Sequence, residues 1–186
     1  MKTEETKRLE MAIWRATHNQ GTFGCFEVTI GWFGKERVDY MTFNTKGEFR
    51  CYEIKVTKAD FNSPCHKSFV GDFNYYVMPL VLYEQVKEKI PEWVGVYASS
   101  DGKTVYSVKK AKRQQETDRE TLKNSIIRSL CREVTKQVKS GDPMAVETLN
   151  RRITELTRDR DDYRRKYWDL RREVEERFGT RWNKED

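Results

Sequence analysis

Three residues in the segment 37–61 have the types and spacing for metal-dependent chemistry on a phosphate: Asp39, Glu53 and Lys55. Carboxylates supply the hard oxygen ligands that Mg²⁺ prefers, and a lysine ammonium can lower the pKa of an attacking water or balance charge on the phosphate. An exposed strand face would carry the same residue types, because charged side chains usually stay in water. The order of the residues favours a site: an aspartate, a glycine turn, then Glu-x-Lys near the end of an apolar strand.

Two strands are predicted to carry these residues. Segments 37–43 and 48–56 are rich in β-branched and aromatic residues. The residues between them have turn chemistry and predict an antiparallel hairpin; they include Asn44, Lys46 and Gly47.

The side-chain period of a strand decides which residues meet. Glu53 and Lys55 are two apart and are predicted to share a face, while Ile54 points to the opposite one. Asp39 is expected within reach on the partner strand. We therefore predict that Asp39 and Glu53 hold a divalent metal, Mg²⁺ with Mn²⁺ as a substitute, aided by the backbone carbonyl of Ile54.

This arrangement resembles the core motif of the PD-(D/E)XK nuclease superfamily, with Asp39, Glu53 and Lys55 at its positions. Across about the first two thirds of the chain, further segments are similar to the MmcB-type DNA repair branch, namely 59–61, 71–79 and 94–98. The resemblance implies an α/β (α+β), restriction-endonuclease-like fold with a central mixed sheet flanked by helices, and DNA as the substrate. The short segment between Phe61 and Asp72 departs from the family, because it compresses the helix that usually carries another polar catalytic residue.

An additional catalytic acid is sought among two glutamates. Glu10 lies near the apolar stripe of a helix predicted over 3–19, and Glu27 lies on a strand predicted over 23–33. Alternation on that strand places one set of side chains on one face and the other set, with Glu27, opposite; the sets are Phe26, Val28, Ile30 and Trp32 against Cys25, Glu27 and Thr29. The MmcB-type branch also has a glutamate on this strand, so we favour Glu27. A glutamate that merely protects an edge strand would look the same.

Three basic residues after the motif are candidates for contact with nucleic-acid phosphates: Lys58, His66 and Lys67. Basic side chains beside a metal-bound phosphate commonly do this. They would look the same as ordinary exposed loop residues.

The composition favours a chain that works in water. The 186 residues are 37% hydrophobic and 35% charged, with a net charge of +6. Opposite charges are interspersed, so nucleic-acid binding is permitted without being required. No apolar run is long enough for a membrane span and residues 1–10 are too charged for a signal peptide, which favours a cytoplasmic protein with no membrane partner.

The chain is predicted to divide into a nuclease-like domain over 1–112 and a helical extension over 113–186, with helices over 118–139 and 142–178. From Leu149 to Arg177 the second helix has a seam in alternating steps of four and three, which is typical of a coiled coil. We expect a homodimer through this helix. Two alternatives stay open: the helix packs back on 118–139, or its arginines follow a nucleic-acid backbone.

Together these patterns favour a metal-dependent DNA endonuclease or DNA-repair nuclease that hydrolyses phosphodiester bonds. The alternative is a catalytically silent nucleic-acid-binding or coiled-coil assembly protein that keeps the nuclease fold, because a fold alone does not establish activity.

Overall fold

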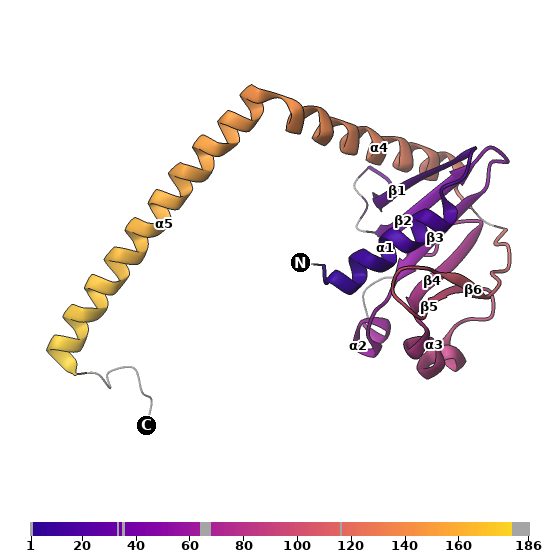
Figure 1. Cartoon of the computed structure of the whole chain (residues 1–186), viewed down its shortest axis with the longest axis horizontal. Coiled ribbons are helices and arrows are strands. Elements are labelled where there is room, and N and C mark those ends of the chain that lie inside the picture. Colours follow the sequence, from indigo (N-terminus) through magenta and orange to yellow (C-terminus); the bar gives the residue numbers. More distant parts are fainter. Residues whose placement is uncertain (1, 33, 35, 64–67, 116, 180–186) are drawn as a thin grey trace. The chain divides into compact units, whose positions relative to one another are not determined.

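The computed structural model describes residues 2–32, 34, 36–63, 68–115 and 117–179 (Figure 1). The chain divides into two compact units, Met1–Glu133 and Val134–Asp186. This boundary lies later than the predicted one after residue 112, because the first half of helix α4 (Arg119–Gly141) packs its Leu122 and Ile126 into the core of the first unit.

The first unit is built on one mixed sheet, which has six strands within the described residues in the order β1-β2-β3-β4-β5-β6. β1, β2 and β3 are antiparallel, β3, β4 and β5 are parallel, and β6 is antiparallel to β5. The strands are β1 (Thr22–Thr29), β2 (Arg37–Asn44), β3 (Phe49–Ile54), β4 (Phe73–Pro79), β5 (Gly95–Ser99) and β6 (Tyr106–Lys109). The predicted α+β class with a central mixed sheet is confirmed.

Helix α1 (Glu4–Thr17) covers one face of this sheet (Figure 1). It begins where predicted, because the Thr3 hydroxyl accepts a hydrogen bond from the backbone N–H of Thr6 at 3.2 Å and caps the first turn. Its apolar stripe, Leu9 and Ile13, is buried against tyrosines of the central strands. Burying a side chain of this size contributes about 1.5–3 kcal/mol.

The opposite face has two covers. The start of α4 packs on β1, β2 and β3, while α2 (Lys58–Asn62) and α3 (Leu80–Val86) pack on β4 and β5. A single turn, η1 (Lys87–Lys89), follows α3 directly. Neighbouring Tyr75 and Tyr76 point into different clusters, as the period of two requires.

The prediction for β1 was wrong in its alternation and its length. Phe26 packs toward α1 beside Tyr40, whereas Val28 lies in the cluster on the other face. The cause is Glu27 between them, whose φ of +53° puts a non-glycine residue in the left-handed region and interrupts the alternation. The strand ends at Thr29 and the chain turns at Gly31, so the rest of the predicted strand is not extended; residue 33 lies outside the described residues.

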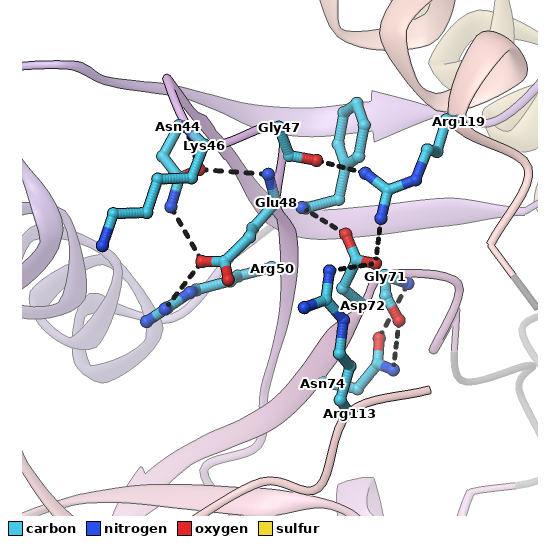
Figure 2. A network of polar contacts seen from close by, with 11 residues as sticks. Asn44, Lys46, Gly47, Glu48, Arg50, Gly71, Asp72, Asn74, Arg113 and Arg119 are labelled. Carbon is cyan, nitrogen blue, oxygen red and sulfur yellow. Dashed lines mark hydrogen bonds and ion pairs between the residues drawn. The ribbon is translucent and has the colours of Figure 1, made fainter. Parts of the chain in front are cut away.

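A buried aspartate ties three segments together at one end of β3 (Figure 2). Asp72 accepts hydrogen bonds from the Phe49 N–H at 2.8 Å and from the Arg119 guanidinium at 2.7 Å, and Arg113 lies 3.7 Å away. Arg119 also donates to the carbonyl of Gly47 in the β2–β3 turn. This network attaches the start of α4 to the hairpin that carries the predicted motif.

The second unit contains helix α5 (Pro143–Phe178), which matches the predicted span 142–178. Asp142 caps it by accepting a hydrogen bond from the Met144 N–H at 3.0 Å, and Pro143 occupies the first turn, where its missing N–H costs nothing. No residue of α5 is buried. In the part of the chain that the structure describes, no helix combines the length and the apolar character needed to cross a membrane.

Candidate active site

The structure brings the two motif carboxylates together where β2 begins and β3 ends. The β2–β3 register pairs Tyr40 with Tyr52, so the next step along the strands sets Asp39 opposite Glu53. Asp39 also accepts a hydrogen bond from the Ile54 N–H at 2.8 Å. The predicted approach of Asp39 to Glu53 and Ile54 is therefore present, although their proposed roles do not follow from position alone.

Glu53 is a buried acid whose hydrogen-bonding capacity is only partly satisfied. Its residue is 3% exposed, and its Oε1 has no hydrogen-bond partner among the described residues. Burial, followed by repulsion from Asp39, raises the pKa of Glu53 to about 8, against the smaller opposing effects of Lys55 and of the Ser68 N–H. A carboxyl group of this kind is poised to bind either a proton or a cation.

Burial has the same kind of effect on the second carboxyl group, Asp39. Burial raises its pKa above the ordinary value, and the hydrogen bond from Ile54 and the positive charge of Lys55 act in the opposite direction. Two carboxyl groups that both resist ionisation, side by side, would be relieved by a divalent cation between them.

Lys55 completes the cluster from a position just past the strand. β3 ends at Ile54, so the predicted strand to residue 56 was too long, but the Lys55 N–H still donates to the Val77 carbonyl at 3.0 Å. Its Nζ lies 3.9 Å from Glu53 Oε2 and 3.6 Å from Asp60 Oδ1, and its side chain is only 12% exposed. Sequence reasoning missed Asp60. Its position three residues after the α2 cap Thr57 was the available signal, because acidic residues favour the first turn of a helix.

Glu27 lies in the same row of the sheet. The β1–β2 register pairs Phe26 with Tyr40 and Val28 with Val38, so Glu27 falls opposite Asp39. Its carboxylate is held by Lys2 at 2.5 Å and by Arg37 at 2.8 Å.

The two glutamate candidates share one cation. Burial opposes ionisation of Glu27, but Lys2 and Arg37 outweigh it and hold the pKa of Glu27 below its usual value. Glu10 of α1 binds the same Lys2 ammonium. Lys2 could not be predicted from local patterns, because it precedes the helix and meets Glu27 only through the packing of α1 on the sheet.

The basic candidates are placed unevenly. Lys58 is exposed at the start of α2 and lines a cleft of about 710 Å³. The cleft is formed by the segments that follow β3, β4 and β5, together with Arg8 of α1. Crevices at the carboxyl ends of parallel strands are frequent ligand sites. His66 and Lys67 lie outside the described residues.

The candidate ligands suit a hard cation that takes only one or two ligands from the protein. Among the described residues no group of three or more His, Cys, Asp or Glu side chains has the arrangement of a metal site. Mg²⁺, however, keeps several waters and is often bound by one or two carboxylates. The buried, unpartnered Oε1 of Glu53 beside Asp39 meets that requirement.

Comparisons with known proteins identify the fold and no function. No family model and no curated protein matches the chain. A solved structure, described as "SPO1766 protein of unknown function from Silicibacter pomeroyi", superposes with a TM-score of 0.61 and 20% identity over 76% of this chain and 97% of the other. At that identity the likeness shows a shared fold alone, so the nuclease family remains a proposal.

Proposed function

We propose that this protein is a metal-dependent nuclease that hydrolyses phosphodiester bonds in DNA. One observation carries the proposal: a buried glutamate, Glu53, has an unpartnered oxygen and a raised pKa beside a second carboxylate and a nearly buried lysine. Leaving a buried acid unsatisfied costs free energy that packing does not recover, and such costs cluster at functional sites.

In this proposal Asp39, Glu53 and the backbone carbonyl of Ile54 would hold Mg²⁺, or Mn²⁺ in its place. The bound cation supplies Lewis-acid stabilisation of the phosphate and lowers the pKa of an attacking water. Both carboxyl groups must be ionised to act as ligands. The positive charge of the cation would offset the repulsion between the ionised Asp39 and Glu53.

Lys55 would act on the nucleophile or on the charge that develops on the phosphate. Its ammonium is within 4 Å of both Glu53 and Asp60, which hold it in a defined place instead of free in solvent. We assign Asp60 to positioning Lys55. Glu27, opposite Asp39, is the additional acid; Lys2 and Arg37 keep it ionised, so it could orient a water as a hydrogen-bond acceptor.

DNA is proposed as the substrate because basic residues adjoin the site. Lys58 and Arg8 line a cleft whose wall includes Val56, the residue after Lys55, and also the acidic Glu5 and Asp101. His66 and Lys67 follow in the sequence. Positive side chains beside a cleavage site position a strand through its phosphates without reading its bases.

Cleavage assays test the proposal directly. The full chain is incubated with plasmid, single-stranded and branched DNA, in Mg²⁺, in Mn²⁺ and in chelator. We expect cleavage of at least one substrate with either metal and none in chelator. Cleavage that survives chelation would contradict the metal requirement, and binding without cleavage in every condition would support the catalytically silent alternative.

Variants separate a true activity from a contaminant. Asp39→Asn and Glu53→Gln keep side-chain size and should remove cleavage. Lys87→Ala is the matched control for changes of lysine, because Lys87 is exposed on η1 and pairs only with a neighbouring glutamate in the contacts of the described chain. Loss of activity in Lys87→Ala as well would show that the measured activity does not belong to this site.

A further inference from the structure

The outer face of α5 carries charges at spacings that can pair within the helix. Arginines recur every seven residues, and acidic residues lie three before or four after them, the spacing at which helical side chains meet. The arginines are Arg151, Arg158, Arg165 and Arg172, and the acids are Glu155, Asp162, Asp169 and Glu176. Two of these pairs are formed within the helix, Arg165–Asp162 at 3.8 Å and Arg172–Asp169 at 2.6 Å. These two pairs satisfy part of the charge of this face without a partner helix.

The other face is an apolar seam whose large side chains are exposed. Leu149 and Ile153 are each 60% exposed and Leu170 is 61% exposed. The seam repeats in steps of three and four over more than four heptads, long enough to pair with another helix. Its positions are Val146, Leu149, Ile153, Leu156, Arg160, Tyr163, Tyr167, Leu170, Val174 and Arg177.

The two arginines in the seam decide the direction of pairing with a second copy. In a parallel, in-register pair each seam residue meets itself, so Arg160 would face Arg160 and Arg177 would face Arg177. In an antiparallel pair the alternating positions meet each other. One register then sets Arg160 against Tyr163 of the second copy, where a guanidinium can stack on an aromatic ring.

The same register joins the other apolar positions, except that it sets Val146 against Arg177 of the second copy. Leu156 meets Tyr167 of the second copy, Ile153 meets Leu170, and Leu149 meets Val174. Antiparallel helices also place opposite ends of their dipoles together, which a parallel pair does not.

The charges that flank the seam select this register independently. On one side lie Arg152, Asp159, Lys166 and Glu173. Flanking charges set orientation in paired helices, and in an antiparallel pair this side meets itself. The register above sets Asp159 against Lys166 and Arg152 against Glu173, both of opposite charge, and two-fold symmetry forms each pair twice.

Shifting the antiparallel pair by one heptad reverses the sign of these contacts. In one direction Asp159 would meet its own copy and Arg152 would meet Lys166. In the other direction Lys166 would meet its own copy and Asp159 would meet Glu173. Both shifted registers are therefore disfavoured by like-charge contacts.

We propose that α5 binds α5 of a second copy of this chain in an antiparallel two-helix coiled coil, with Arg160 of each copy against Tyr163 of the other. This surface is independent of the proposed nuclease site, so either proposal can fail without the other.

Mass measurement with charge reversal tests it on the full chain. Light scattering should give a dimer. Glu173→Arg places two arginines together twice and should raise the dimer dissociation constant roughly tenfold or more, and adding Arg152→Glu should restore it to within about threefold of the original. Glu176→Arg makes the same charge change on the outer face and is the matched control, with an expected shift below about threefold.

The outcomes are separable. A monomer at every concentration overturns the proposal and favours folding back on α4. Unchanged dimerisation of Glu173→Arg overturns the register, because a parallel pair sets Glu173 against Phe178 and is insensitive to this charge.

Disulfide trapping tests the direction itself. Leu156→Cys and Tyr167→Cys are prepared separately, with Cys65 and Cys131 replaced by serine. The proposal expects oxidation to link the two variants only when they are mixed. Linkage of each variant to itself alone is the parallel result and would overturn the proposal, as would no linkage in any sample.

Discussion

Two buried acids lie near opposite ends of β3 and differ in the partners that surround them. Asp72 is 1% exposed and accepts a backbone N–H and an arginine, with a second arginine close by (Figure 2). Glu53 is 3% exposed, has one oxygen without a described partner and faces another carboxylate. The two acids have the same degree of burial, so the difference between them lies in their partners.

This difference separates an acid that stabilises the fold from an acid that can still bind a proton or a cation. A buried carboxylate surrounded by donors stabilises the arrangement of the segments that donate to it. A buried carboxylate that leaves one oxygen without a donor costs free energy, and the cost falls when a proton or a cation binds. Variants at the two ends should therefore fail in different assays.

The largest effect is expected on turnover at the Glu53 end. Lys55→Ala should lower the cleavage rate by roughly 10² to 10⁴ while the protein stays folded, because the ammonium acts on the nucleophile or the transition-state charge. Single-turnover cleavage and circular dichroism are measured on the same samples. Near-normal turnover by a folded Lys55→Ala protein would remove this lysine from the mechanism.

The next effect is on stability at the Asp72 end. Asp72→Ala leaves the Phe49 N–H without its acceptor and two arginines without their anion, which should cost about 2–4 kcal/mol. Asp72→Asn keeps an acceptor for Phe49 and should lose less. Denaturant unfolding gives both values, and an Asp72→Ala protein as stable as the original would show that this network is dispensable.

At Glu53 the sign of the stability change should reverse. Its pKa rises from 4.5 to about 8 on folding, so between these pH values the folded state binds more protons than the unfolded state. Stability from this group therefore falls as pH rises through that window. Without metal, Glu53→Gln should raise Tm at pH 8 by several degrees and change it little at pH 5. A variant less stable than the original at pH 8 would refute the unsatisfied-acid interpretation.

The smallest effect on stability is expected at Glu27, whose backbone is in a strained conformation. At its φ of +53° a glycine is unstrained, whereas the Cβ of an alanine makes this conformation unfavourable. Both substitutions remove the same ion pairs, so Glu27→Gly should be more stable than Glu27→Ala by about 1 kcal/mol. In an ordinary strand alanine would be the more stable of the two, and that order in thermal unfolding would argue against strain at this residue.

Local patterns were enough to predict much of this molecule. The β2–β3 hairpin, the cap of α1 and the long α5 follow from residue types and periodicity, which act over a few neighbouring residues. The meeting of Asp39 and Glu53 followed from the hairpin register.

What sequence reasoning missed depends on distant packing. Asp72 meets Arg119 across 47 residues of chain, and Lys2 meets Glu27 only because α1 lies on the sheet. The left-handed backbone at Glu27 has no local signal, because glutamate rarely adopts it. The packing of the first half of α4 on the sheet was not predicted, because the stripe of α4 does not say which surface covers it.

The most direct test of the central claim is calorimetric titration of Mn²⁺ into the full chain from pH 6 to pH 7.5. We expect one bound ion per chain, with an affinity that rises roughly tenfold per pH unit because Glu53 must release its proton. Asp39→Asn, verified as folded by its unfolding transition, should abolish the binding. Equal binding by Asp39→Asn, or an affinity independent of pH, would contradict the account and place any metal elsewhere.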